Sequence, residues 1–280
     1  MKKRVISSVA ILIGMLLLVI FSEYIVYPVA LAALAVIAIF EILRVVGEHK
    51  RLVISIPAYI IAAVMPICAY FVTEALVLPL LLALAAAVFV YLVWLMGVSI
   101  FSKGKIPFSK VSEVFAAVCY VAVSFTSLSL IRYIDRTVGV FFVVLVFVIS
   151  WACDVFAFAV GSLIGKHKLI PEISPKKTVE GAIGGIAFSA LFCMLYGLIL
   201  ELIFGLSANY LYLFLFGAIL SVVSQLGDLI ASLIKREYGV KDYGKIFPGH
   251  GGVMDRFDSV LAVSTILLIL SIVLPPFASA

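Results

Sequence analysis

The stretch LVLPLLLALAAAVFVYLVWLMGV, residues 76–98, contains no acidic, basic or histidine side chain. An α-helix of about 20 apolar residues crosses the hydrocarbon core of a bilayer, so this stretch is expected to be a transmembrane helix. Similar runs recur along the chain and predict an all-α polytopic membrane protein with about nine spans. The spans are expected near residues 5–21, 26–46, 52–73, 76–98, 112–131, 137–162, 181–204, 210–235 and 253–276.

The composition leads to the same conclusion. Of the 280 residues, 65% are hydrophobic and 12% are charged, and the mean hydropathy is +1.31. These values lie well outside the usual range of soluble domains. Nine spans and their connections fill the length and leave no room for a separate soluble domain. The four cysteines lie in apolar runs without C-x-x-C spacing, so neither a disulfide framework nor a zinc site is indicated.

The basic residues predict the orientation of the chain. Of the 20 Lys and Arg residues, only Arg132 and Arg136 fall in connections on one side, which leaves 18 for the other. Because cytoplasmic loops carry the excess of basic residues, we expect a cytoplasmic N-terminus and an external C-terminus in the cytoplasmic membrane. The same asymmetry explains the net charge of +5 without nucleic acid, since the clusters lack interleaved aromatic residues.

Polar residues divide the chain unevenly. Residues 1–136 are predicted to form a five-helix scaffold, and residues 137–280 a four-helix catalytic part with cytosolic loops. The two longest polar connections, 163–180 and 236–252, lie in this second part. Both parts are expected to belong to one continuous membrane domain.

Four carboxylates lie in or beside the predicted spans: Asp154, Asp228, Asp255 and Asp258. A charge at the bilayer centre costs about 2.5–3.5 kcal/mol on insertion scales, so such residues indicate function. One helical face carries Asp228 together with Ser224, Ser232 and Lys235, at steps of four and three residues. A structural alternative for this face is that its side chains form hydrogen bonds between packed helices. The structural alternative for Asp154 is an ion pair with a basic loop residue.

The segment ISPKKTVEG, residues 173–181, precedes a glycine-rich helix start. Two lysines beside the free amides of a helix N-terminus favour a phosphate site. The alternative is cytoplasmic positive charge followed by small residues for close helix packing.

The densest group of polar residues runs from Ser232 to Asp258. Its glycines allow a close approach of the backbone to a ligand. Asp255 and Asp258, three residues apart, share a helix face and suit magnesium, which one or two carboxylates hold together with substrate phosphates. His250 can act as a general base, donate to phosphate or be a loop residue. Glu41, at a cytosolic helix end, is expected to snorkel to the surface.

The segment 232–258 resembles the signature of phosphatidate cytidylyltransferases, also called CDP-diacylglycerol synthases. The matching positions are Ser232, Lys235, Arg236, Lys241, Asp242, Gly244, Pro248, His250, Gly251, Gly252, Asp255, Arg256 and Asp258. Upstream features of the family also match: the helix of Asp154, the segment from Ser174 to Gly181, and Ser224 to Asp228. The resemblance is close over residues 150–260 and rests on hydropathy alone in the first five spans.

The resemblance implies transfer of a cytidylyl group from CTP to phosphatidate, which yields CDP-diacylglycerol and pyrophosphate. It also implies a magnesium requirement, room for a second, monovalent cation, contact with membrane lipids and a homodimer. Metal ligation is expected from Asp228 and Asp255 first, then from Asp258 and Asp154. Catalytic roles are expected for Asp228, Lys235, Arg236, Lys241, Asp242, His250, Asp255 and Arg256. Substrate binding is expected from Ser174, Lys176, Lys177, Thr178, Ser224, Ser232, Gly251 and Gly252.

Three other functions are compatible with parts of the pattern. An ion-coupled transporter would also place carboxylates in membrane helices, but it predicts polar groups at mid-membrane and internal repeats. A CTP-dependent lipid kinase or a cytidylyltransferase for archaeal lipids would share the nucleotide and metal site. A catalytically silent homologue is disfavoured because every motif position is filled.

Overall fold

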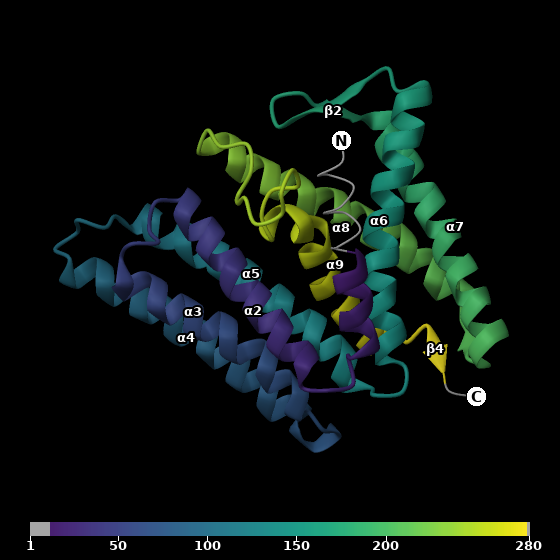
Figure 1. The fold of residues 1–280 in the computed structure, drawn as a ribbon, viewed down its shortest axis with the longest axis horizontal. Coiled ribbons are helices and arrows are strands. Elements are labelled where there is room, and N and C mark those ends of the chain that lie inside the picture. The colour runs from purple at the N-terminus through teal and green to yellow at the C-terminus, as the bar shows by residue number, and fades with distance from the viewer. Residues whose placement is uncertain (1–11, 279–280) are drawn as a thin grey trace. The chain divides into compact units, whose positions relative to one another are not determined.

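The computed structural model describes residues 12–278, where eight helices are long and apolar enough to cross a membrane. They are α2 Val26–Val45, α3 Leu52–Cys68, α4 Val77–Phe101, α5 Phe108–Ile134, α6 Gly139–Ile164, α7 Val179–Phe204, α8 Tyr210–Glu237 and α9 Met254–Val273 (Figure 1). Two short 3-10 helices, η1 Ala69–Phe71 and η2 Glu74–Leu76, lie between α3 and α4. Eight predicted spans are thereby confirmed. The ninth, at 5–21, begins outside the described residues, and residues 12–20 are helical.

The described chain divides into two compact units. The first comprises residues 12–134 and 238–256, and the second comprises residues 135–237 and 257–278. Helix α9 starts in the first unit and continues in the second. The predicted division into a scaffold at 1–136 and a catalytic part at 137–280 stays a prediction.

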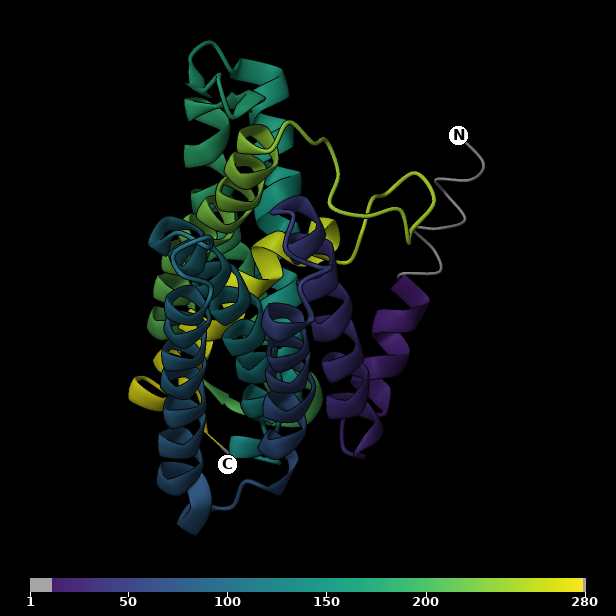
Figure 2. The same ribbon diagram turned by 90° about the vertical axis from the view of Figure 1, so that its left-hand side faces the viewer.

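In the first unit, α2, α3 and α5 pack against one another (Figure 2). Buried polar groups on α5 are matched by the neighbouring helices, because an unpaired polar group in an apolar interior is costly. The Tyr27 hydroxyl donates to the Leu128 carbonyl at 3.2 Å, and the Ser129 hydroxyl donates to the carbonyl of Pro66, a residue inside α3, at 2.8 Å. The first bond ties α2 to α5 and the second ties α5 to α3, and the position of α2 bears on the site described below.

In the second unit, α6, α7 and α8 pack together through small residues. A Cβ added to Gly184 of α7 would lie 2.6 Å from Val160 of α6, and one added to Gly217 of α8 would lie 2.6 Å from Ala190 of α7. Both distances are below van der Waals contact, so only glycine permits these close helix crossings. At Gly184, the glycine-rich start of α7 therefore serves helix packing.

Short strands complete the second unit. Strands β1 Lys168–Ile170 and β2 Ser174–Thr178 form an antiparallel hairpin in which Lys168 faces Thr178. Strands β3 Ser207–Ala208 and β4 Phe277–Ala278 pair near the C-terminus. The hairpin occupies the polar connection at 163–180, for which hydropathy gave no strand prediction, and it brings β2 directly into the start of α7.

Candidate active site

Helix α8 presents the polar face that the sequence predicts. Ser224 is fully buried and Asp228 is half-buried, and the Ser232 hydroxyl donates to Asp228 Oδ1 at 3.4 Å. The Gln225 side chain donates from its amide to the Ala182 carbonyl of α7 at 3.2 Å, which anchors this part of α8. Sequence reasoning did not single out Gln225.

Asp228 meets the β2 segment through an ion pair. Lys177 Nζ lies 2.6 Å from Asp228 Oδ2, and the two side chains are only 22% and 29% exposed. Partial removal from water strengthens such a pair relative to a fully exposed one. Two segments that lie far apart in the sequence, and that were both predicted to serve the site, thus come into direct contact.

The junction of β2 and α7 sets the direction of Lys177. Lys176 is exposed, whereas the next residue, Lys177, is half-buried. Thr178 then caps α7, because its hydroxyl accepts the N–H of Gly181 at 3.1 Å. Glu180 in the first turn accepts the N–H groups of Lys166 and His167 and contacts His167 Nδ1 at 2.6 Å. These bonds tie the hairpin to the start of α7.

A cavity of about 300 Å³ opens beside this junction. The polar side chains in its lining include Asp154 from α6, Lys176 and Lys177 from β2, and Gln225 from α8. The rest of the lining is largely apolar or small, with Phe158 and Gly161 among them. The two lysines make this cavity suited to an anionic group such as a phosphate.

Asp258, on the second turn of α9, belongs to the same unit. It lies within electrostatic range of Asp228, Lys235 and Asp154. The backbones of α8 and α9 approach closely there, since a Cβ added to Gly227 would lie 2.7 Å from the Asp258 carbonyl oxygen. Three of the four predicted metal ligands are therefore near one another in the second unit.

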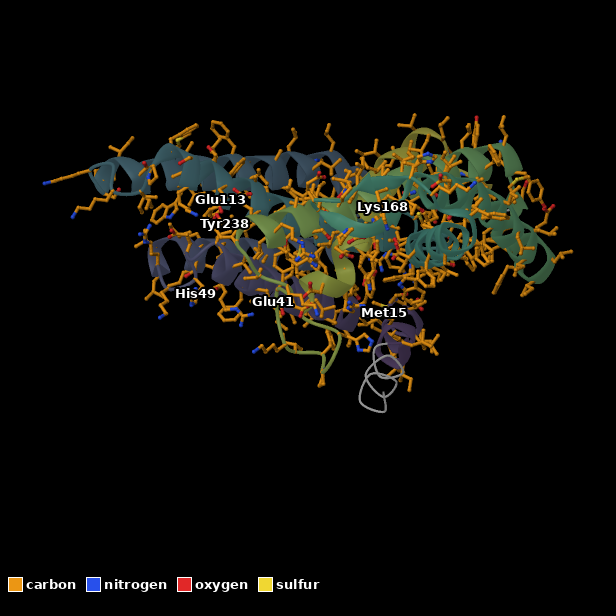
Figure 3. All side chains as sticks on the ribbon, turned by 90° about the horizontal axis from the view of Figure 1, so that it is seen from above. Met15, Glu41, His49, Glu113, Lys168 and Tyr238 are labelled. Carbon is orange, nitrogen blue, oxygen red and sulfur yellow. The ribbon has the colours of Figure 1, made fainter. Side chains whose placement is uncertain are left out.

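The signature residues from Lys241 to Arg256 lie in the first unit, in the loop at 238–253 and the first turn of α9. The start of the loop is tied to α5, because Lys110 Nζ contacts the Tyr238 hydroxyl at 3.0 Å and Glu113 at 2.7 Å. Figure 3 shows Glu113 and Tyr238 near each other. The sequence Phe247-Pro248-Gly249-His250 forms a type II turn: the N–H of His250 donates to the Phe247 carbonyl at 2.9 Å, and Gly249 has a φ of 80°.

Asp255 holds this loop from the first turn of α9. Its Oδ2 accepts the N–H of Tyr243 at 2.7 Å and the N–H of Gly252 at 2.9 Å. Asp255 is 7% exposed, whereas Lys241, Asp242 and Arg256 are exposed. Asp255 was predicted as a metal ligand, and the structure shows that one of its oxygens already bonds two backbone amides.

Other predicted residues are only loosely held or exposed. Arg236 is exposed, and its Nε donates to the Ile173 carbonyl at the long distance of 3.4 Å. Ser174 begins β2, where its Cα pairs with that of Ile170. His250 is half-buried. The roles predicted for these residues stay predictions.

The expectation for Glu41 was wrong. Its side chain does not reach the surface: the residue is 1% exposed, and its Oε2 accepts the N–H of Met254, the first residue of α9, at 2.9 Å. An available signal was the acid itself, which lies with Arg44 in an otherwise apolar helix. Hydropathy cannot reveal the partner, which is 213 residues away.

Comparison with known proteins identifies one family that matches almost the whole chain. The sequence profile of the cytidylyltransferase family matches residues 2–274. The chain belongs to this family. A phosphatidate cytidylyltransferase of Bacillus subtilis is 34% identical over 276 residues, which cover 96% of this chain and 97% of that protein.

Relatives from staphylococci within the cytidylyltransferase family match the chain in part. The phosphatidate cytidylyltransferase of Staphylococcus epidermidis is 41% identical over 174 residues, which cover 62% of this chain and 64% of that protein. The enzyme of that name from Staphylococcus aureus is 41% identical over 176 residues, with the same coverage. Membership of the cytidylyltransferase family confirms the resemblance drawn from the segment 232–258.

Proposed function

We propose that this chain transfers a cytidylyl group from CTP to phosphatidate and so forms CDP-diacylglycerol and pyrophosphate. The observation that carries the proposal is the family match over residues 2–274, together with a relative of that activity aligned over nearly its full length. The lysine-lined cavity beside Asp228 adds support, because both substrates are phosphate anions.

The chemistry requires the protein to position charges. A phosphate oxygen of phosphatidate attacks the α-phosphorus of CTP, a new P–O bond forms, and the bond to the bridging oxygen breaks as pyrophosphate leaves. Lys176 and Lys177, which line the cavity, would offset the repulsion between the two anions, in the way that cationic clamps stabilise phosphoryl transfer. A phosphomonoester is largely ionised near neutral pH, so no strong base is needed. His250 is accordingly assigned a positioning or electrostatic role.

The acidic residues fit a magnesium ion that also binds substrate. Within residues 12–278 no group of three or more His, Cys, Asp or Glu side chains is arranged to hold a metal by itself. Magnesium commonly uses one or two carboxylates, with substrate phosphates and waters completing its shell. Asp228 and Asp258 would hold the ion, with Asp154 nearby, and Asp255 stays a predicted ligand. When bound, the ion would neutralise charge on the phosphates.

Topology and assembly are part of the proposal. The spans identify an integral membrane protein, and the basic residues favour a site that faces the cytoplasm, with a cytoplasmic N-terminus. Lys103→Cys and Arg136→Cys, each in a background without the four native cysteines, test this topology. An impermeant maleimide should label only Arg136→Cys in intact cells, and the reverse pattern would indicate the opposite topology.

A homodimer is proposed from the resemblance and is tested by measuring the mass of the protein in detergent.

The reaction is tested by single-turnover assays on purified protein in detergent. CTP labelled at the α- or γ-phosphate is incubated with phosphatidate, with and without magnesium, for wild type, Asp228→Asn and Asp135→Asn. Asp135 is a matched control because it accepts only local N–H groups of Thr137 and Val138 among the bonds described, and asparagine can keep these bonds.

The outcomes separate the candidate functions. Magnesium-dependent release of pyrophosphate that needs phosphatidate, persists in Asp135→Asn and is lost in Asp228→Asn supports the proposal. Release of CDP would instead indicate a lipid kinase. No turnover with phosphatidate, but turnover with an ether-linked lipid phosphate, would indicate the archaeal-lipid reaction. No nucleotide turnover with any lipid phosphate would refute the assignment as an enzyme and favour the ion-coupled transporter.

A further inference from the structure

Glu41 is a buried carboxylate at the end of an apolar helix, and it touches the first residue of another helix. Its Oε2 accepts the N–H of Met254 at 2.9 Å. The first N–H groups of a helix have no partner within the helix, and negative charge is favourable there. Glu41 of α2 therefore acts as an N-terminal cap for α9, the helix whose first two turns carry Asp255 and Asp258.

The glycine-rich loop is built around the same carboxylate. Gly244 and Gly252 both approach Glu41 so closely that a Cβ at either position would overlap its carboxylate oxygens. A side chain at either position would push the loop away from Glu41. These two family glycines thus have a structural partner in the first unit, independent of any ligand.

A second residue of α2 holds the same loop. The Arg44 guanidinium, one turn after Glu41, donates to the carbonyl of Tyr243, whose N–H donates to Asp255 Oδ2 at 2.7 Å. Tyr243 is fully buried. The backbone at Tyr243 is consequently held on one side by α2 and on the other by Asp255.

The buried carboxylate of Glu41 is energetically unfavourable, so a role in packing alone does not explain it. Among the described residues, no hydrogen-bond partner reaches Glu41 Oε1, although this atom is buried. Its carboxylate also lies within electrostatic range of Asp255, a like charge, and of Arg44, an opposite one. Burying an incompletely paired carboxylate is unfavourable, and an apolar residue at this position would avoid that penalty.

We propose that Glu41 is a positioning residue of the cytidylyl-transfer site: its carboxylate holds the loop at 243–252 and the start of α9, and thereby sets the placement of Asp255. The inference rests on the proposed function for its catalytic consequence. Glu41 itself does not touch the reacting atoms in this assignment; it acts through Met254, Gly252 and Asp255.

The test compares Glu41→Ala and Glu41→Gln with Glu48→Gln in the full-length protein. Glu48 is a matched control because it is also buried, lies seven residues further on, and pairs with Arg51 rather than with the loop. Glutamine at position 41 keeps an acceptor for Met254 but loses the charge. The readouts are turnover, the KM for CTP, the magnesium concentration at half-maximal rate, the unfolding temperature, and hydrogen exchange of peptides from 243–256.

We expect faster exchange across 243–256 in Glu41→Ala, a smaller change in Glu41→Gln, and none in Glu48→Gln. Loss of a residue that orients a metal-binding group commonly lowers metal affinity or activity by about 10–100-fold. Turnover should therefore fall, or the magnesium requirement rise, by about tenfold or more in Glu41→Ala, while the KM for CTP changes less than threefold. If Glu41→Ala does not fold, Glu41→Gln decides by the same readouts.

Two results would overturn the inference. One is wild-type exchange and kinetics in both Glu41 variants. The other is a loss of activity that only follows a loss of folded protein, with turnover per folded molecule and the magnesium requirement unchanged. An inactive wild type would refute the proposed function instead, and the exchange measurement would still decide whether Glu41 holds the loop.

Discussion

Gly227, the residue before Asp228, lies at a close approach of α8 to α9. In Gly227→Ala, the new Cβ would lie 2.7 Å from the Asp258 carbonyl oxygen and 2.8 Å from the Ala262 Cβ. Ordinary contact begins near 3.4 Å, so the first distance is about 0.7 Å too short. The obstructing atoms are backbone and a methyl group, which no side-chain rotation can remove. The two helices must therefore move apart locally.

The energetic consequence follows from two opposing effects. Overpacking a close contact costs about 1–3 kcal/mol, and alanine recovers about 1 kcal/mol of helix propensity relative to glycine. The expected net loss of stability is thus up to about 2 kcal/mol. The catalytic effect should be larger, because a displacement of about 1 Å can lower a rate by about 100-fold. A shift of several tenths of an ångström between Asp228 and Asp258 should lower turnover by about tenfold.

Pyrophosphate release and thermal unfolding in detergent measure both effects. Gly97→Ala in α4 is the matched control, because a Cβ there meets no atom within 4 Å. This control should keep wild-type turnover and gain up to about 1 kcal/mol of stability. Wild-type turnover and unfolding temperature in Gly227→Ala would refute the reasoning that the α8–α9 contact sets the distance between the two carboxylates.

Three further predictions concern the junctions around the site. Lys177→Met should lower kcat/KM for pyrophosphate release by about 100-fold, as loss of a donor to a transferring group does. Adding Asp228→Asn should then have less effect than it has alone, and fully additive losses would contradict a coupled pair. Gly251 has a φ of 85°, and a Cβ added there would lie 2.6 Å from Asp255 Oδ2. Gly251→Ala should therefore destabilise the protein by at least about 1–2 kcal/mol and lower turnover. An unchanged unfolding temperature would exclude strain at this position. Thr178→Val should lower stability by about 1 kcal/mol through loss of the α7 cap, whereas Thr178→Ser should not, and equal unfolding temperatures of the two variants would count against the cap.

Local patterns in the sequence were sufficient for the spans and for the polar face of α8. Predicted and observed bounds differ by four residues at the start of α5, where the run from 112 was expected and the helix begins at Phe108. That difference arises because Lys110 and Glu113 pair within the helix and extend it past the apolar run. The hairpin at 168–178 was not predicted because its strands are short and polar.

The candidate site was predictable as a set of residues but not as a set of contacts. The signature from Ser232 to Asp258 indicated the family, and the family match confirms it. The pairing of Lys177 with Asp228 and the cap that Glu41 provides for α9 join segments far apart in the chain. No spacing rule connects such residues.

The sequence by itself determined that the protein is a membrane protein, where the eight described spans lie and which family it belongs to. It could do so because hydropathy, helical period and motif spacing are local properties of the chain. Only the tertiary structure decided which charges meet. Burial makes an unpaired charge costly, so the partner of Glu41 or Lys177 depends on which backbone atoms or side chains the folded helices bring within bonding distance.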